Sequence, residues 1–349
     1  MHTDANELAL SDPQALAAAL APWVVGRFGA EAAISGLRLL AGGASQQVWR
    51  LEIAASTGPL ALIVRRDLGG RMFATALGRQ AEYAVIELAY GAGVPVPQPY
   101  AYLENLDGKT AFVMACLEGE TIGRRIVREP SLANARRLLP QQMGSALAAI
   151  HGIAVAEAAF LPGPAAGEGA AAYGLRLLEQ ELAAVAEPYP ALELGLAWLR
   201  AHPPAELPPV LCHGDYRVGN VVVDEQGLVG VLDWEFAHRG HPGEDLTFGA
   251  IRAWRFGEAG KRYGGVGDMA AFLSAYNTAR GTAFTEGELY WFEVASNLKW
   301  AIATVTQARR HLSGQEPSLE LASLGRMTAE IELEILSLLD PRHPRHPGD

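Results

Sequence analysis

The 349-residue sequence contains only two cysteines, Cys116 and Cys212, and it has no long uninterrupted apolar run. Two cysteines in apolar surroundings are too few for a disulfide framework, which favours a reducing compartment, so we expect a cytoplasmic protein. The most apolar early segment, residues 15–25, is interrupted by Pro22 and has no basic leader. This pattern is typical of an amphipathic helix rather than of a signal peptide or a membrane span, and we expect no membrane partner.

Positive charge is also scarce, because 28 Lys and Arg residues stand against 39 Asp and Glu residues, for a net charge of −11. This balance argues against nucleic acid or an anionic membrane as a main partner. Most of the acidic excess follows Leu117. We interpret it as a solvated acidic surface, with the attraction of a cationic substrate as the alternative.

The most informative stretch is 210–246, which contains the polar loop HGDYRVGN at 213–220. Two apolar runs follow the loop, and the turn-like residues 224–227 between them predict a short hairpin. This hairpin would bring together three oxygen-bearing side chains, those of Asp215, Asn220 and Asp233.

Hard cations such as magnesium prefer oxygen ligands and keep several waters, so one Asn and one Asp with substrate phosphates suffice to bind the ion. Phosphoryl transfer needs that metal and a separate carboxylate that receives the proton of the attacking hydroxyl. The alternative interpretation is a polar loop beside a structural hairpin, in which Asp and Asn serve turns.

The pattern HGDxxxxN, followed 13 residues after Asn220 by Asp233 and Trp234, resembles the catalytic core of the aminoglycoside phosphotransferase family, relatives of the protein kinases. The similarity is greatest to the broad phosphotransferase branch that includes the kinase-like part of acyl-CoA dehydrogenase fusion proteins. The resemblance covers about residues 35–310. It implies an α+β, protein-kinase-like fold with two lobes, a small N-lobe with an antiparallel sheet and a larger, mostly helical C-lobe.

The same resemblance implies transfer of the γ-phosphoryl group of ATP, with Mg2+, to a hydroxyl of a small molecule. By this resemblance, Asp215 orients and deprotonates the acceptor, while Asn220 and Asp233 hold the metal. His213 supports the geometry of the loop. Asp245 ties the following helix to the loop backbone.

Nucleotide contacts are expected in the first third of the chain. Two strand-like segments flank residues 42–45, where family members carry a Gly/Ser turn over ATP, so Gly43 and Ser45 are candidates to contact phosphate. The third strand ends with Arg65 and Arg66, where protein kinases have a Lys. Because side chains alternate across a strand, only one of the two faces the nucleotide, and we assign Arg65 to that role.

Three further nucleotide-site residues follow from the resemblance. Glu82, in the predicted helix 78–92, matches the glutamate that pairs with the strand cation. The segment 112–119 resembles the hinge between kinase lobes. There, adenine would be read by the Ala115 carbonyl and the Leu117 N–H.

The sequence predicts four parts: a helical extension at 1–34, the N-lobe at 35–117, the C-lobe at 118–340 and a disordered tail at 341–349. Helices after Glu258 would line the acceptor pocket. No residue selects one hydroxyl acceptor over another, and none indicates the oligomeric state.

Two functions of other classes remain open. The missing strand Lys allows a pseudokinase that binds a nucleotide without turnover. A metal-dependent hydrolase would be built on His213, Asp215 and Asp233, with His238 and His241 as the candidates for further ligands.

Overall fold

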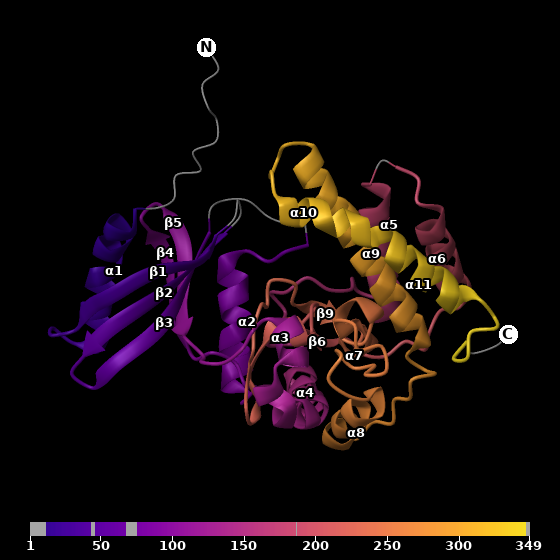
Figure 1. Cartoon of the computed structure of the whole chain (residues 1–349), viewed down its shortest axis with the longest axis horizontal. Helices are drawn as coiled ribbons and strands as arrows, with labels where there is room; N and C mark the ends of the chain where they lie inside the picture. Colours follow the sequence, from indigo (N-terminus) through magenta and orange to yellow (C-terminus); the bar gives the residue numbers. More distant parts are fainter. Residues whose placement is uncertain (1–11, 43–45, 68–74, 186, 347–349) are drawn as a thin grey trace, which may run out of the picture. The chain divides into compact units, whose positions relative to one another are not determined.

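The computed structural model of the chain describes residues 12–42, 46–67, 75–185 and 187–346 (Figure 1). The chain forms two compact units, which we call the sheet unit and the helical unit. The sheet unit contains Met1–Tyr90 and Val96–Leu117, and the helical unit contains Gly91–Pro95 and Glu118–Asp349. The predicted Gly/Ser turn, with Gly43 and Ser45, lies outside the described residues.

The sheet unit is built on one antiparallel sheet of five strands in the order β1-β2-β3-β5-β4. Its strands are β1 (Ala33–Gly42), β2 (Gln46–Ala55), β3 (Gly58–Asp67), β4 (Pro99–Leu106) and β5 (Lys109–Ala115). Burial alternates along β2, where Trp49, Leu51 and Ile53 are buried and their neighbours are not. This period of two is expected of a strand with one face on a core.

The described residues of the sheet unit also form two helices, α1 (Pro13–Phe28) and α2 (Arg79–Gly91). Asp12 caps α1, because its carboxylate accepts a hydrogen bond from the Gln14 N–H at 2.9 Å. Apolar residues spaced by four along α1 are fully buried in the core of the sheet: Leu16, Leu20 and Val24. Helix α1 is therefore packed on the sheet and is part of this unit.

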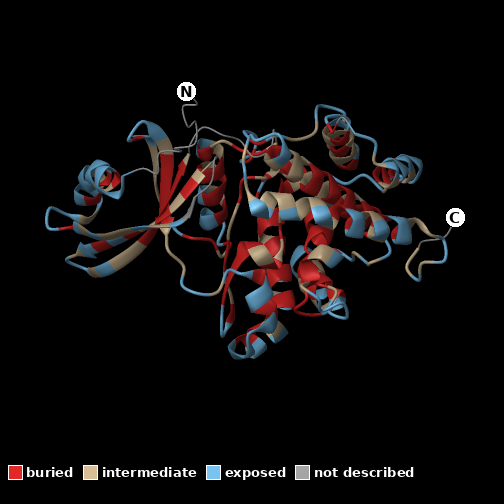
Figure 2. Ribbon diagram, turned by 45° about the horizontal axis from the view of Figure 1, so that its top comes forward, coloured by how far each residue is buried: buried red, intermediate tan, exposed pale blue. Residues whose placement is uncertain are grey.

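The helical unit is mostly α-helical. Its helices are α3 (Gly123–Arg128), α4 (Ala133–Gly152), α5 (Ala170–Ala183), α6 (Pro190–Ala201), α7 (Gly243–Phe248), α8 (Met269–Arg280), α9 (Tyr290–Leu312), α10 (Leu319–Leu324) and α11 (Thr328–Leu339). Along α4, Leu139, Met143, Leu147 and Ile150 are buried, and Figure 2 shows buried residues on the inner faces of the helices. Helix α8 packs closely on α4 at Gly144, where a Cβ atom would collide with the Phe272 carbonyl. The structure thus confirms a small antiparallel-sheet lobe and a larger helical lobe.

Two short strand pairs complete the helical unit: β6 (Val210–Cys212) with β9 (His238–Gly240), and β7 (Val221–Asp224) with β8 (Gly227–Val231). The second pair is the hairpin predicted from the sequence. Its register sets Val221 opposite Val231, and the Leu232 N–H donates to the Asn220 carbonyl at 2.8 Å. Asn220 and Asp233 therefore leave the same end of one hairpin.

The last described residues of the chain form helices and a packed segment. Residues 319–339 form α10, a single 3-10 turn and α11. Residues 341–346 of the expected disordered tail lie against α9, because the Arg345 guanidinium pairs with the Glu293 carboxylate at 2.9 Å. Among the described residues, no helix combines the length and the apolar character needed to cross a bilayer.

Candidate active site

The loop between β6 and β7 holds the Asp215 carboxylate by two donors. Oδ2 accepts from Asn220 Nδ2 at 2.6 Å, and Oδ1 accepts from Arg217 Nε at 2.9 Å. Asn220 Nδ2 also donates to the Asp215 carbonyl at 2.9 Å. Because the nitrogen of Asn220 faces Asp215, its amide oxygen is the atom left to bind a cation.

Asp233 follows β8 with a left-handed backbone, at φ of +65°. Such a conformation is uncommon for a non-glycine residue, and strain of this kind gathers at functional sites. The next residue, Trp234, is fully buried and contacts the His213 ring, with 4.7 Å between centroids. The turn after β8 is therefore anchored, and the hairpin brings Asp233 to the same end as Asn220.

His213 connects the loop with the end of the hairpin. Its Nδ1 accepts from the Asp215 N–H at 3.2 Å, so the proton lies on Nε2, which donates to the Leu232 carbonyl at 2.9 Å. Complete burial lowers the pKa of His213. A neutral imidazole with both nitrogens engaged suits a structural role.

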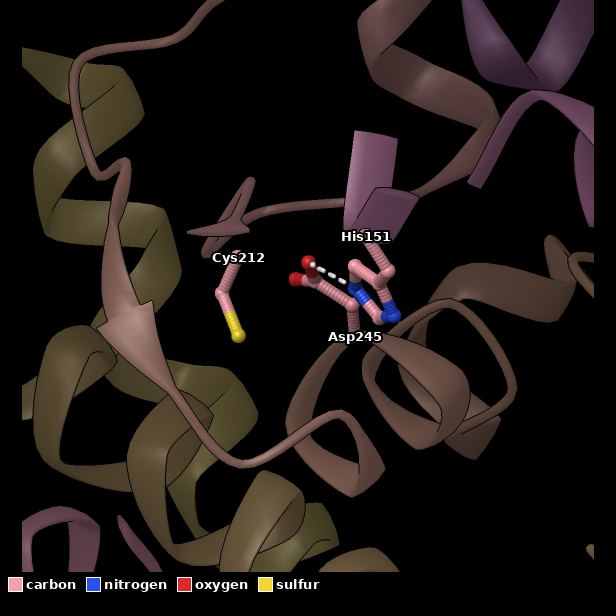
Figure 3. Close-up of side chains that lie close together, drawn as sticks. All are labelled: His151, Cys212 and Asp245. Carbon is pink, nitrogen blue, oxygen red and sulfur yellow. Dashed lines mark hydrogen bonds and ion pairs between the residues drawn. The ribbon is translucent and has the colours of Figure 1, made fainter. Parts of the chain in front are cut away.

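Asp245, on α7, joins the loop to two distant helices, and Figure 3 shows its contact with His151. Its carboxylate accepts from the N–H groups of His213 at 2.6 Å and Gly214 at 2.9 Å. It also contacts His151 Nε2 at 3.2 Å, and His151 Nδ1 contacts the Tyr276 hydroxyl at 2.8 Å. This is the geometry that the predicted scaffolding role of Asp245 needs.

The contacts of Asp245 lead to a pH-dependent prediction. Burial raises the pKa of Asp245, but the hydrogen bond and the charge of His151 outweigh burial and lower that pKa to about 2. A lowered carboxyl pKa adds stability above the unfolded value of 3.8, and this stability is lost as the pH falls toward 2. Asp245→Asn should therefore lower the free energy of unfolding at pH 7 by about 2 kcal/mol and weaken its dependence on pH between about 4 and 2.

Urea unfolding of both proteins at several pH values measures this difference. Asp340→Asn is the matched control, because Arg342 also lowers the pKa of Asp340 to about 2, but at the solvent-exposed surface. Water screens that pair, so the control should unfold like the parent protein. Equal effects of the two substitutions would contradict a structural role of buried Asp245.

Lys299, on α9, is a loop contact that the sequence analysis missed. Its Nζ donates to the Gly214 carbonyl at 2.6 Å and lies 5.2 Å from the centroid of the Phe248 ring. A single lysine in a largely buried helix is the signal that the sequence offered. The loop is therefore held from α7 by a carboxylate and from α9 by an ammonium group.

Arg65 and Glu82 form the ion pair expected in the sheet unit. The Arg65 guanidinium lies 2.8 Å from the Glu82 carboxylate, and both side chains are buried. Arg79 also pairs with Glu82. Arg66 points to the other face of β3 and pairs with Asp107 at 3.0 Å. Arg65 and Arg66 thus lie on opposite faces of β3, and Arg65 is the arginine that pairs with Glu82.

The predicted hinge residues end strand β5. The Ala115 N–H donates to the Gln98 carbonyl at 2.8 Å, and the Cys116 N–H donates to the Ala61 carbonyl at 3.0 Å. These two hydrogen bonds do not use the groups assigned to adenine, which are the Ala115 carbonyl and the Leu117 N–H.

The proposed hydrolase site is not supported by the described residues. His238 contacts the Glu244 carboxylate at 3.0 Å, and His241 stacks on Phe292 with 4.2 Å between ring centroids. In the described chain, the groups with metal-ligand spacing are His151–Cys212–Asp245 and Cys212–His238–Glu244, and neither includes Asp215 or Asp233.

The cluster drawn in Figure 3 is a hydrogen-bonded core. Each Asp245 oxygen already accepts from a loop N–H, and the Cys212 thiol lies 3.6 Å from the His241 carbonyl. Burial raises the pKa of Cys212 well above its usual value, so the thiol stays protonated.

Comparisons with known proteins identify the family of this chain. The family model described as "Phosphotransferase enzyme family" matches residues 36–292. Acyl-CoA dehydrogenase family member 11 of Gallus gallus is 28% identical over 302 residues, which are 80% of this chain and 38% of that protein. The chain thus spans well under half the length of that relative.

Solved structures share the fold. A Ralstonia eutropha protein classed with the aminoglycoside phosphotransferases has a TM-score of 0.68 and 20% identity, over 94% of this chain and 98% of that one. The GDP and kanamycin complex of an aminoglycoside phosphotransferase, APH(2″)-IIIa, has a TM-score of 0.60 and 14% identity, over 90% of this chain and 98% of that one. The protein-kinase-like fold is therefore confirmed, and with a family match over most of its length this chain belongs to the phosphotransferase enzyme family.

Proposed function

We propose that the protein is a small-molecule kinase that transfers the γ-phosphoryl group of ATP to a hydroxyl group. The observation that carries this proposal is the register of the β7–β8 hairpin, which brings Asn220 and Asp233 to one end, next to the held carboxylate of Asp215. Membership of a phosphotransferase family and the GDP complex of a structural neighbour support a purine nucleotide as the donor.

The donor atoms fit magnesium. An amide oxygen and a carboxylate are hard oxygen ligands, and substrate phosphates and water would complete the shell. Bound magnesium would neutralise charge on the phosphates. Asn220 and Asp233 would hold the ion. The hydrogen bond from Asn220 to Asp215 would fix the position of this metal ligand relative to the proposed base.

Asp215 would act on the acceptor. With one oxygen held by Asn220 and the other by Arg217, its carboxylate has a fixed direction and can orient an incoming hydroxyl. In the loose transition state of phosphoryl transfer, orientation contributes more than early removal of the proton. Asp215 would receive that proton as the new O–P bond forms.

Arg65 would contact the nucleotide phosphates. Glu82 neutralises and orients the guanidinium, as their 2.8 Å ion pair shows. Arginine keeps its charge and grips phosphate through two N–H groups, so it can replace the lysine of protein kinases. Gly43 and Ser45 remain predicted phosphate contacts, and Ala115 and Leu117 remain predicted adenine contacts.

Nucleotide binding is the first test. Millimolar ATP with Mg2+ should raise the melting temperature by several degrees, because a ligand at about 100 times its Kd stabilises the folded state by about 2.7 kcal/mol. Differential scanning fluorimetry with ATP, GTP and AMP, each with and without Mg2+, measures the shift. If folded protein shows no shift with either triphosphate, the nucleotide assignment is wrong.

Turnover separates a kinase from a pseudokinase. A screen of metabolite pools with ATP labelled at the γ-phosphoryl should give a labelled product that appears only with enzyme and Mg2+. A pseudokinase would show the thermal shift without labelled product. The screen also identifies the acceptor.

A further inference from the structure

We propose that Arg217 is a further catalytic residue, which holds Asp215 through Nε and contacts the transferred phosphoryl group through its terminal nitrogens. This proposal rests on the kinase function proposed above. It assigns a role to a cation that the family resemblance left without one.

The first observation is the way in which Arg217 meets the base. Its Nε–H donates to Asp215 Oδ1 at 2.9 Å, which uses one of the five N–H bonds of the guanidinium. Across the described parts of the chain, the two terminal nitrogens of Arg217 make no hydrogen bond to a protein group. The cation is thus tied to the base by one edge and keeps four N–H bonds for a ligand.

The second observation is that the guanidinium is held in place by its surroundings. It lies over the face of Trp254, with 4.2 Å from its central carbon to the ring centroid. Trp254 in turn packs on Phe248 and Trp300. A Cβ atom at position 219 would collide with a terminal nitrogen of Arg217, so Gly219 leaves the space that the guanidinium occupies.

The pair also keeps access to a ligand, because the side chains of Arg217 and Asp215 are 21% and 14% exposed. A planar group with parallel N–H bonds matches the oxygens of a phosphoryl group, on which negative charge is spread in the transition state.

That Arg217 can reach the transferred phosphoryl group follows from the geometry of the reaction. The acceptor hydroxyl donates to Asp215 while its oxygen attacks phosphorus, so the transferred group lies one atom beyond the base. A guanidinium bonded to the same carboxylate can reach the oxygens of that group. The O–P bond to the acceptor forms, the P–O bond to the departing diphosphate breaks, the acceptor proton passes to Asp215, and Arg217 keeps its proton throughout.

The test compares Arg217→Met and Arg217→Lys with the parent protein. Removal of one preorganised donor to a transition-state oxygen costs about 100- to 1000-fold in kcat, and we expect a loss of this size in Arg217→Met. The lysine variant should recover part of the loss. The KM for the acceptor and the Kd for ATP should stay within about threefold, because neither ground state requires this contact.

A binding measurement gives a readout without turnover. Calorimetric titration with ADP and Mg2+, with and without aluminium fluoride as a mimic of the transferred group, should show that the parent protein gains affinity from the mimic. Arg217→Met should bind ADP normally and lose most of that gain. Arg252→Ala is the matched control, because Arg252 lies in the same segment as Trp254 with an exposed side chain and should behave like the parent.

Each outcome decides between the two proposals. A kcat of Arg217→Met within threefold of an active parent would overturn the role of Arg217 and leave the kinase function intact. A raised acceptor KM at unchanged kcat would also overturn it, because Arg217 would then bind the acceptor. A parent protein that transfers no phosphoryl group and gains no affinity from the mimic would overturn the kinase function and this inference together.

Discussion

Asp233→Asn is expected to lower the turnover of phosphoryl transfer by more than about a thousandfold, which is ~4 kcal/mol in activation free energy. The substitution removes one full charge from the proposed magnesium site and keeps the shape of the side chain. Folding should hardly change, because Asn tolerates the left-handed backbone that the structure shows at this position, with φ of +65°.

Turnover, the melting temperature and the thermal shift with Mg2+ and ATP test this expectation together. Asp224→Asn is the matched control, because Asp224 accepts the Gln226 N–H at 2.7 Å in the exposed turn of the same hairpin. Asn can make that contact too. An active Asp233→Asn enzyme would remove Asp233 from the mechanism.

Asp215→Ala is expected to lower transfer to the acceptor by about 100- to 10,000-fold, the range of general-base and orienting groups. The affinity for ATP should stay within a few fold, because Arg65, Asn220 and Asp233 would hold the phosphates and the metal. Loss of the carboxylate leaves Arg217 Nε without its acceptor, while Asn220 Nδ2 keeps only the backbone carbonyl of residue 215. Asp215→Asn therefore serves as a second variant that keeps the shape of the loop.

Calorimetric titration with ATP and turnover on the identified acceptor test both halves of this prediction. Unchanged turnover would show that another group is the base. If binding and turnover disappeared together in a folded variant, Asp215 would be a ligand of the nucleotide or the metal. The roles within the loop would then have to be exchanged.

Local patterns predicted the parts of the fold that depend on neighbours in the chain. The turn residues 224–227 and the apolar runs beside them predicted the β7–β8 hairpin, and its register fixed the ends at Asn220 and Asp233. Alternation along β3 predicted that Arg65 and Arg66 face opposite sides, which their separate partners confirm. Strand periodicity and turn chemistry act over a few residues, so a single sequence displays them.

Contacts between segments that are distant in the sequence could not be predicted from such local patterns. His151 and Asp245 are separated by 94 positions, and Lys299 and Gly214 by 85. A lone histidine at the end of a helix and a lone lysine within another carry no local signal of their partners. Their contacts arise because α4, α7 and α9 pack around the loop, and that packing depends on the whole helical unit.

The buried carboxylate of Asp245 has a consequence for the evolution of specificity. It fixes the backbone of His213 and Gly214 from inside the helical unit, through α7 and the histidine of α4. The backbone just before Asp215, the proposed base, is thereby positioned by core residues, while Asn220 and Arg217 hold its carboxylate. Under the proposed function, substitutions around the acceptor would therefore change which molecule is phosphorylated without disturbing the backbone that carries Asp215.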